Sequence, residues 1–157
     1  MKKLFALILA VVMIATMSTT AFAANTTGGS TEVSFNVDPT YTVTIPATVE
    51  LNKVEDNGTV TYENDYTIGA NAGVRLKKNE YIEVTVASDF EMTTTEGATL
   101  AYTITAEDAA VATGGVVATF GTDKNAQSTT IHIAANDPDY AGEYKDTVTF
   151  TVAVKTN

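Results

Sequence analysis

Apolar and polar residues alternate along several short stretches of the chain. The longest alternation comes last, with Val148, Phe150, Val152 and Val154 on one face and mostly threonines between them. A period of two over this length is typical of a β-strand with one buried face, because a slip of one residue would move the whole apolar set into water. We therefore predict that residues 146–154 form the closing strand of a sheet.

The same alternation recurs at short intervals through the rest of the chain. Turn residues separate the stretches, and Asn57-Gly58 is the strongest hairpin signal among them. No stretch has apolar residues at a helical period, and residues 106–112, which have helix-forming composition, are too short for more than one turn of helix. The pattern predicts an all-β fold, a single immunoglobulin-like antiparallel β-sandwich of about eight to ten strands. Besides the closing strand, the strand pieces are expected at residues 32–37, 41–45 and 47–51 (one strand interrupted by prolines), 59–62, 66–68, 74–76, 81–86, 90–92, 99–104, 116–120 and 128–133.

The first residues have the anatomy of a secretory signal peptide. Lys2 and Lys3 precede an uncharged apolar run of 14 residues, Leu4 to Met17, and Ala21-Phe22-Ala23 is a small-x-small cleavage site. The alternative, a retained membrane helix, needs about 20 apolar residues. We predict a signal peptide over 1–23, a flexible leader over 24–31 and a β-sandwich domain over 32–157, in a protein that is secreted and has no membrane association after the signal is removed.

Charge and cysteine content narrow the class of protein further. Removal of residues 1–23 leaves 7 basic and 19 acidic side chains, a net charge of −12. This balance argues against nucleic acid and anionic membrane surfaces as partners, because both select basic faces. Cysteine is absent, so thiolate metal sites, cysteine nucleophiles and disulfides are excluded.

Catalytic residues are sparse in the sequence. His132, the only histidine, lies between Ile131 and Ile133 on an expected strand, so its side chain faces away from theirs and is interpreted as a surface residue rather than a base or a metal ligand. Carboxylate pairs such as Glu91 with Glu96 are expected by chance among so many acids, and no tryptophan is present to stack on a sugar. We predict a protein that is not an enzyme, with no catalytic residue, no cofactor and no metal site.

Two loops leave a calcium alternative open. Residues 136–139 and 55–57 each gather carboxylate and amide oxygens, the ligands that Ca²⁺ prefers. Neither matches the spacing of an EF-hand, and such clusters are ordinary in turns. A turn role is therefore the favoured interpretation.

Tyrosines near strand ends are the candidate aromatic contacts. Tyr62, Tyr66 and Tyr140 could meet a glycan or a protein if they are exposed. Tyr144, just before the closing strand, is interpreted as a tyrosine corner that closes one end of the sandwich.

Two segments resemble a known kind of protein. Residues 37–47, Val-Asp-Pro-Thr-Tyr-Thr-Val-Thr-Ile-Pro-Ala, resemble the opening of small secreted immunoglobulin-like and pilin-like β-sandwich proteins of Gram-positive bacteria, and residues 140–152, Tyr-Ala-Gly-Glu-Tyr-Lys-Asp-Thr-Val-Thr-Phe-Thr-Val, resemble their closing strand. The closing pattern is also similar to spore-coat/pilin subunits and to surface domains named for a Trp-x-Leu motif, whose tryptophan is missing here. The resemblance implies an extracellular or cell-surface structural protein, and a fibre subunit among the options.

The favoured hypothesis is a secreted, non-enzymatic structural or adhesive module whose partner is a protein, either another copy or a surface partner. Val33, Phe35 and Val37 form a candidate strand-exchange face that a neighbouring sheet edge could accept. The simpler expectation is that this strand pairs within its own domain. The alternative function is a carbohydrate- or cell-wall-binding module with a glycan partner, which requires an exposed row of aromatic side chains.

Overall fold

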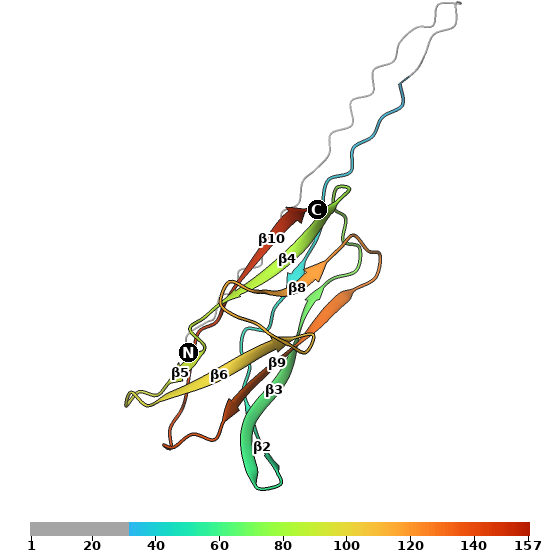
Figure 1. Ribbon diagram of the computed structural model, residues 1–157. Coiled ribbons are helices and arrows are strands. Elements are labelled where there is room, and N and C mark those ends of the chain that lie inside the picture. The colour runs from blue at the N-terminus through green and yellow to red at the C-terminus, as the bar shows by residue number, and fades with distance from the viewer. Residues whose placement is uncertain (1–31) are drawn as a thin grey trace, which may run out of the picture. The chain divides into compact units, whose positions relative to one another are not determined.

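The strands of the computed structural model form two antiparallel sheets (Figure 1). The structure describes residues 32–157, so the predicted signal peptide (1–23) and leader (24–31) lie outside the described residues. Asn36–Asn157 form one compact unit. Across the described range, no helix is long and apolar enough to cross a membrane. The strands are β1 (Val43–Thr44), β2 (Asn52–Asp56), β3 (Thr59–Ala70), β4 (Glu80–Ala87), β5 (Glu91–Thr93), β6 (Thr99–Ala106), β7 (Ala109–Ala110), β8 (Val116–Phe120), β9 (Gln127–Asn136) and β10 (Thr149–Thr156).

The larger sheet has the strand order β1-β3-β9-β6-β5. In addition, β2 pairs with β3 and β7 pairs with β6. The smaller sheet has the order β10-β4-β8. All pairs are antiparallel, so the predicted antiparallel β-sandwich of about eight to ten strands is confirmed.

The core lies between the two sheets and follows the predicted alternation. In β4, the three inward side chains are Ile82, Val84 and Val86, and each is at most 1% exposed. The other large, fully buried side chains are Ile68, Val74, Ile104, Phe120 and Ile131. Burial of such aliphatic side chains, each worth about 1.5–3 kcal/mol relative to an exposed one, stabilises the fold without disulfides.

The two pieces predicted at residues 59–62 and 66–68 belong to one long strand, β3. Its first half pairs with β2 through the predicted hairpin at Asn57-Gly58, where both residues have positive φ, 50° and 81°. Such a pair of left-handed residues matches the right-handed twist of the flanking strands. The hairpin prediction is therefore confirmed.

Three of the expected strand pieces are not strands: residues 47–51 form none, residues 74–76 make only isolated bridges at Val74 and Arg75, and the third piece is 32–37. Residues 32–37 form no strand, so the expected pairing of this segment within its own domain is not seen, and Val33 and Phe35 are 90% and 87% exposed. Residues 106–112, which were expected to form no more than one turn of helix, contain the hairpin between β6 and β7, with its turn at Glu107-Asp108. The segment is too short for a stable helix, and its backbone instead forms hydrogen bonds with the adjacent strand β6.

The closing strand is confirmed, but its expected burial is only partly correct. β10 begins at Thr149, and its apolar face pairs with β4 in the register Phe150–Val86, Val152–Val84 and Val154–Ile82. Phe150 is half-buried, whereas Val152 and Val154 are 37% and 38% exposed. The reason is position, because β10 is an edge strand whose only strand partner in the described part of the chain is β4.

Candidate functional site

The free edge of β10 is the most unusual feature of the described surface. Residues 149–154 carry no charged side chain and no proline. In an antiparallel pair, alternate residues direct their N–H and C=O groups away from the partner, and no backbone hydrogen bond from the outer side of β10 reaches another strand among residues 32–157. Natural edge strands are usually protected by charge, proline, bulges or short length, and a long apolar edge without them is a template for another strand.

The opposite edge of the small sheet differs from that of β10. β8 has five residues, and its register with β4 shifts between Val84 and Thr85, as at a β-bulge. Bulges and short strands are the usual means of keeping an edge from pairing with another chain. The small sheet therefore has one protected edge and one receptive edge.

The inner face of β10 is anchored at one end and open at the other. The Phe150 ring meets the Tyr66 ring of β3 edge-on, with 6.4 Å between centroids, so the two sheets touch there. Further along, Val152 and Val154 keep more than a third of their surface exposed although they point to the core side of the sheet. This exposed apolar row lies directly beside the unpaired backbone edge.

The predicted strand-exchange residues match this edge in pattern. Val33, Phe35 and Val37 recur at every second position and are 90%, 87% and 51% exposed. A five-residue extended segment spans roughly 17 Å, so it can cover the middle of an eight-residue strand such as β10. The strand-exchange role of this face stays a prediction, and β10 has the length and the apolar period that such a role requires.

A hydrogen-bonded cluster fixes the chain where it enters β10. The Tyr102 hydroxyl donates to Asp146 Oδ2 at 2.6 Å, and Ser88 Oγ donates to the same oxygen at 2.7 Å. Burial, and then the bond to Asp146, raise the pKa of Tyr102. Burial by itself would raise the pKa of Asp146, but the bonds from Ser88, Tyr102 and the Thr147 amide outweigh it and hold that pKa below its usual value.

This cluster could not be predicted from the sequence, because its members are distant along the chain and form no local motif. Its members are 14 and 44 residues apart along the chain and meet only when β6 packs beside the end of β4. Tyr102 lies in a predicted strand piece, residues 99–104, but its polar partners were not predicted.

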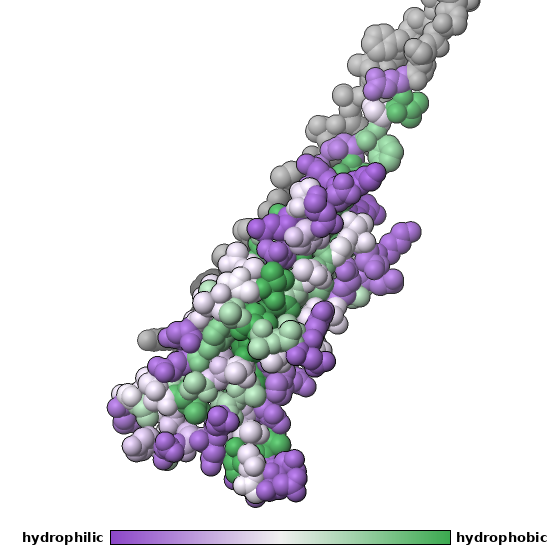
Figure 2. All heavy atoms as spheres, in the orientation of Figure 1, coloured by the Kyte–Doolittle hydropathy of each residue, from purple (hydrophilic) through white to green (hydrophobic). Residues whose placement is uncertain are grey.

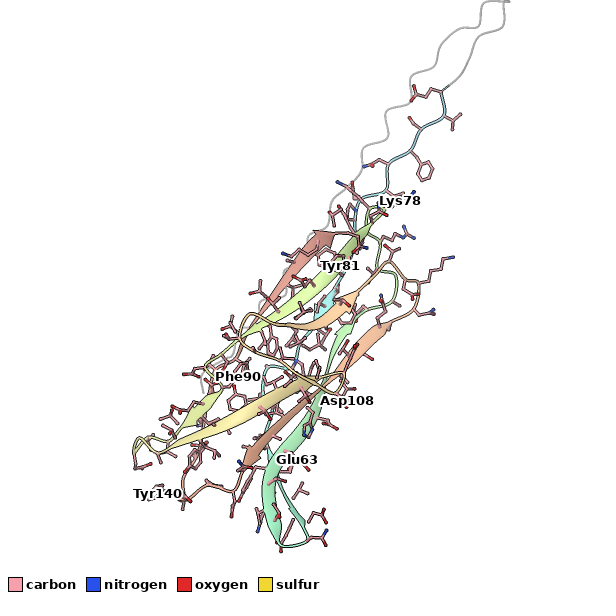
Figure 3. The ribbon with its side chains drawn as sticks, viewed as in Figure 1. Glu63, Lys78, Tyr81, Phe90, Asp108 and Tyr140 are labelled. Carbon is pink, nitrogen blue, oxygen red and sulfur yellow. The ribbon has the colours of Figure 1, made fainter. Side chains whose placement is uncertain are left out.

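The remaining candidates are dispersed, and Figure 3 shows Tyr140 and Glu63 among the labelled side chains. Tyr62 and Tyr66 are half-buried on the core side of β3, and Tyr140 is 69% exposed in the loop before β10, so these three tyrosines do not form an exposed row. Tyr144 donates from its hydroxyl to the Tyr140 carbonyl at 2.9 Å, the bond expected of a tyrosine corner.

His132 lies on the outer face of β9, as predicted. Its Nδ1 is 2.7 Å from Asp65 Oδ1 and its Nε2 is 3.6 Å from Glu63 Oε2, with 39% of the side chain exposed. Within residues 32–157, no group of three or more histidine, cysteine, aspartate or glutamate side chains is arranged to hold a metal ion. In the loop at 55–57, Asn57 Nδ2 donates to Asp56 Oδ1, which is turn chemistry.

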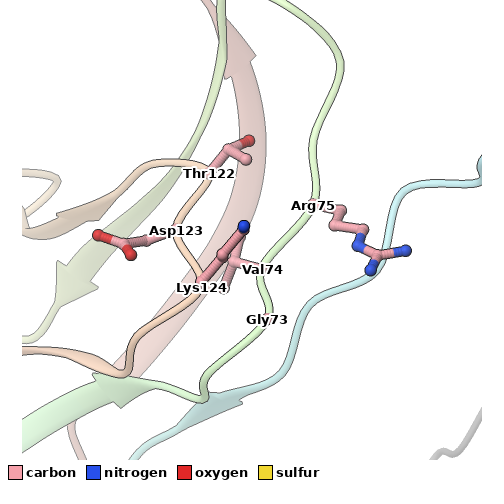
Figure 4. Close-up of a pocket in the computed structure, with 6 residues that line it drawn as sticks. All are labelled: Gly73, Val74, Arg75, Thr122, Asp123 and Lys124. Carbon is pink, nitrogen blue, oxygen red and sulfur yellow. The ribbon is translucent and has the colours of Figure 1, made fainter.

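A surface hollow of about 590 Å³ lies between the loop after β3 and the loop after β8. Figure 4 shows its lining side chains: Arg75 and Asp123 point away from each other, so charged groups do not converge on a common point. This hollow therefore lacks the convergent polar groups that small-molecule sites use.

Comparisons with known proteins do not identify a family for this chain. No known protein family matches the chain, and no curated protein matches it. One similar solved structure is reported as "Chaperone-tip adhesin complex is vital for synergistic activation of CFA/I fimbriae biogenesis", with a TM-score of 0.41 and 14% sequence identity. The match covers 74% of this chain and 42% of that chain, so this protein spans less than half the length of its structural neighbour.

Proposed function

We propose that this protein is a secreted, non-enzymatic module of the cell surface, a structural or adhesive subunit that associates with copies of itself by strand addition. One observation carries the proposal: the outer edge of β10 is uncharged, pairs with no strand within residues 32–157, and lies beside the exposed apolar row of Val152 and Val154. A strand added to this edge would satisfy its backbone groups and cover its apolar row in one step.

A second copy is the favoured occupant because the chain itself carries a matching segment. Val33, Phe35 and Val37 present the same two-residue period as the β10 face, and they are exposed. Main-chain hydrogen bonds supply affinity in strand addition, and alternate side chains supply specificity. A glycan-binding role has less support, since Tyr140 is the one tyrosine of the three candidates that is largely exposed.

Size-exclusion chromatography and negative-stain microscopy of residues 24–157 test the proposal. We expect oligomers or filaments that disappear when residues 24–38 are deleted. Phe35→Asp should have the same effect, because it places a charge on the apolar face of the segment. Asn36→Asp, which adds the same charge one position along on the opposite face, is the matched control and should still associate. A strictly monomeric parent protein at high concentration would contradict the proposal.

A further inference from the structure

We infer that copies associate head to tail, with the basic end of one sandwich on the acidic end of the next, and that residues 33–37 then pair antiparallel with β10 of the neighbour. This inference rests on the proposed strand addition and specifies its direction and register. It is carried by the distribution of charge and by the place where the N-terminal segment leaves the sandwich.

Basic side chains gather at one end of the sandwich although the protein is strongly acidic. This basic end comprises residues 75–80, 121–125 and 155–157, which are held together by the hydrogen bonds from the Leu76 amide to Thr122 Oγ1 (3.1 Å) and from the Asn157 amide to the Asn79 carbonyl (2.9 Å). It carries five of the seven basic residues outside the predicted signal peptide and two carboxylates. The basic residues are Arg75, Lys77, Lys78, Lys124 and Lys155, and the carboxylates are Glu80 and Asp123.

Most of these cations are available to a partner. Lys155 forms an ion pair with Glu83 at 3.7 Å, whereas Arg75, Lys77, Lys78 and Lys124 form none within 4 Å among the described residues. Figure 3 shows Lys78 at this end, and Figure 2 shows hydrophilic side chains gathered at both ends of the sandwich with apolar ones over its middle.

The opposite end has the opposite charge. This acidic end comprises residues 53–58, 94–98 and 136–146: β9 ends at Asn136 opposite Thr61, the β2–β3 turn extends beyond that pair, and the loop after β9 returns beside β5 where Lys145 bridges Thr93. It carries seven carboxylates and two lysines. Both lysines are already paired at this end, Lys53 with Glu55 at 3.7 Å and Lys145 with Glu143 at 2.8 Å. The two ends are therefore electrostatically complementary, which favours a heterologous contact over a contact between like ends.

The course of the chain gives the direction of the added strand. Thr40 pairs with Arg75, so the segment that precedes it leaves from the basic end. β10 runs toward the basic end: its first residue, Thr149, pairs with Ala87, and its last, Thr156, pairs with Glu80 of the basic end. A segment that passes from the basic end of one copy to the acidic end of the next meets the start of β10 first and lies antiparallel to it.

The apolar residues then pair in a single register. Val37 faces Phe150, Phe35 faces Val152 and Val33 faces Val154, so all three apolar pairs coincide. Pro39 lacks an amide hydrogen, which ends strand pairing at the junction between copies. If the segment instead folded back onto its own β10, it would run parallel and place Val37, not Val33, opposite Val154.

Cysteine cross-linking separates these arrangements, because the chain has no cysteine of its own. The variant with Val33→Cys and Val154→Cys should form a ladder of disulfide-linked multimers on mild oxidation, and reductant should abolish it. The variant with Val37→Cys and Val154→Cys is the matched control and should cross-link at least tenfold more slowly, since residues four apart in an extended strand lie roughly 13 Å from each other. Faster cross-linking in the control, or its conversion to a cyclised monomer, would overturn the inference.

Charge reversal tests the contact between the ends separately. Lys77→Glu with Lys78→Glu should weaken association about tenfold, an effect that high salt reduces, because it opposes like charges across the contact. Lys145→Glu, a reversal at the acidic end, should not weaken association. Undiminished association of the Lys77/Lys78 variant would overturn the head-to-tail contact. Failure of the proposed function is distinguishable, since the parent protein would then stay monomeric and neither cysteine pair would cross-link between chains.

Discussion

Three polar side chains form hydrogen bonds with one another just before the last strand, β10. Ser88 follows β4, Tyr102 belongs to β6 and Asp146 precedes β10, so their hydrogen bonds join three segments that are distant in sequence. The Tyr102 ring also packs edge-on against Phe90, with 5.7 Å between centroids. Tyr102 thus combines apolar packing with a charge-assisted hydrogen bond, and the two contributions can be separated by mutation.

Tyr102→Phe should lower the free energy of unfolding by about 1.5–3 kcal/mol, the range for a hydrogen bond to a charged group. The ring and its packing against Phe90 remain, so the loss reports the hydroxyl alone. Urea unfolding followed by circular dichroism measures it. Tyr140→Phe, at a largely exposed position, is the control and should change stability by less than about 0.5 kcal/mol. Equal effects of the two substitutions would contradict the role of the Asp146 cluster.

Alkaline pH should destabilise the protein through its buried tyrosines. Burial raises the pKa of Tyr66 to about 12 from its ordinary value of 10.0, so its stabilising contribution is complete below pH 10 and is lost as the pH rises from 10 to about 12. Urea unfolding at stepped pH, with phenolate absorbance in parallel, follows this loss. Tyr66→Phe keeps the ring beside Phe150 and should reduce the alkaline loss. An unchanged pH profile in that variant would show that Tyr66 is not responsible.

At the scale of elements, the β2–β3 and β6–β7 turns have the same left-handed backbone geometry, but only the first has residues that adopt it at low cost. The β2–β3 turn has Asn57 and Gly58 at φ 50° and 81°, whereas the β6–β7 turn has Glu107 and Asp108 at 50° and 64°. Left-handed backbone is cheap for glycine and asparagine but costly for glutamate. This explains why the first hairpin was predictable from the sequence and the second was not.

The double substitution Glu107→Asn with Asp108→Gly should raise the free energy of unfolding by about 1 kcal/mol, because both new residues tolerate the left-handed region. The reciprocal change, Asn57→Glu with Gly58→Asp, should lower it by a similar amount. Thermal unfolding of the two variants beside the parent protein makes the comparison. A destabilised Asn-Gly variant at 107–108 would contradict the assigned turn.

The predicted alternation identified most strands, and its errors have physical reasons. Periodicity shows which face of a strand is apolar, as it did for β4 and β9, but it carries no information on whether a strand has one neighbour or two. The apolar faces of residues 33–37 and of β10 were therefore recognised, whereas their exposure was not. Polar residues at 63–65 interrupt the apolar alternation between the two predicted pieces of β3. Glu63 and Asp65 lie on its outer face beside His132, and Asn64, on the inner face, donates to the Glu50 carbonyl at 2.7 Å.

A charge on the inner face of β10 should block association. Val152→Lys places an inward-pointing lysine on the edge strand, a device that natural proteins use against edge pairing. Thr151→Lys adds the same charge to the same strand on its outer face and is the matched control. Analytical ultracentrifugation should show a monomer for Val152→Lys and the parent distribution for Thr151→Lys. Association of both variants to the same extent would rule out the β10 face as the contact.

At the scale of the whole molecule, stability and association should be coupled. If the folded chain pairs with other copies and the unfolded chain does not, mass action makes the unfolding midpoint depend on protein concentration. We expect the midpoint of residues 24–157 to rise with concentration and that of Phe35→Asp to stay constant. Differential scanning fluorimetry over a hundredfold concentration range measures both. A parent midpoint independent of concentration would indicate that any oligomers contribute nothing to stability.

The open edge of β10 also bears on when and where the protein can be made. A chain that folds with a receptive edge and carries its own complementary segment can pair as soon as two copies fold in one compartment, and the rate rises with the square of their concentration there. Under the proposed function, folding during synthesis would produce premature assemblies inside the cell. Export before folding, which the predicted signal peptide would direct, therefore delays assembly until the chains are outside the cell. Folding there is then sufficient to start assembly, without a ligand.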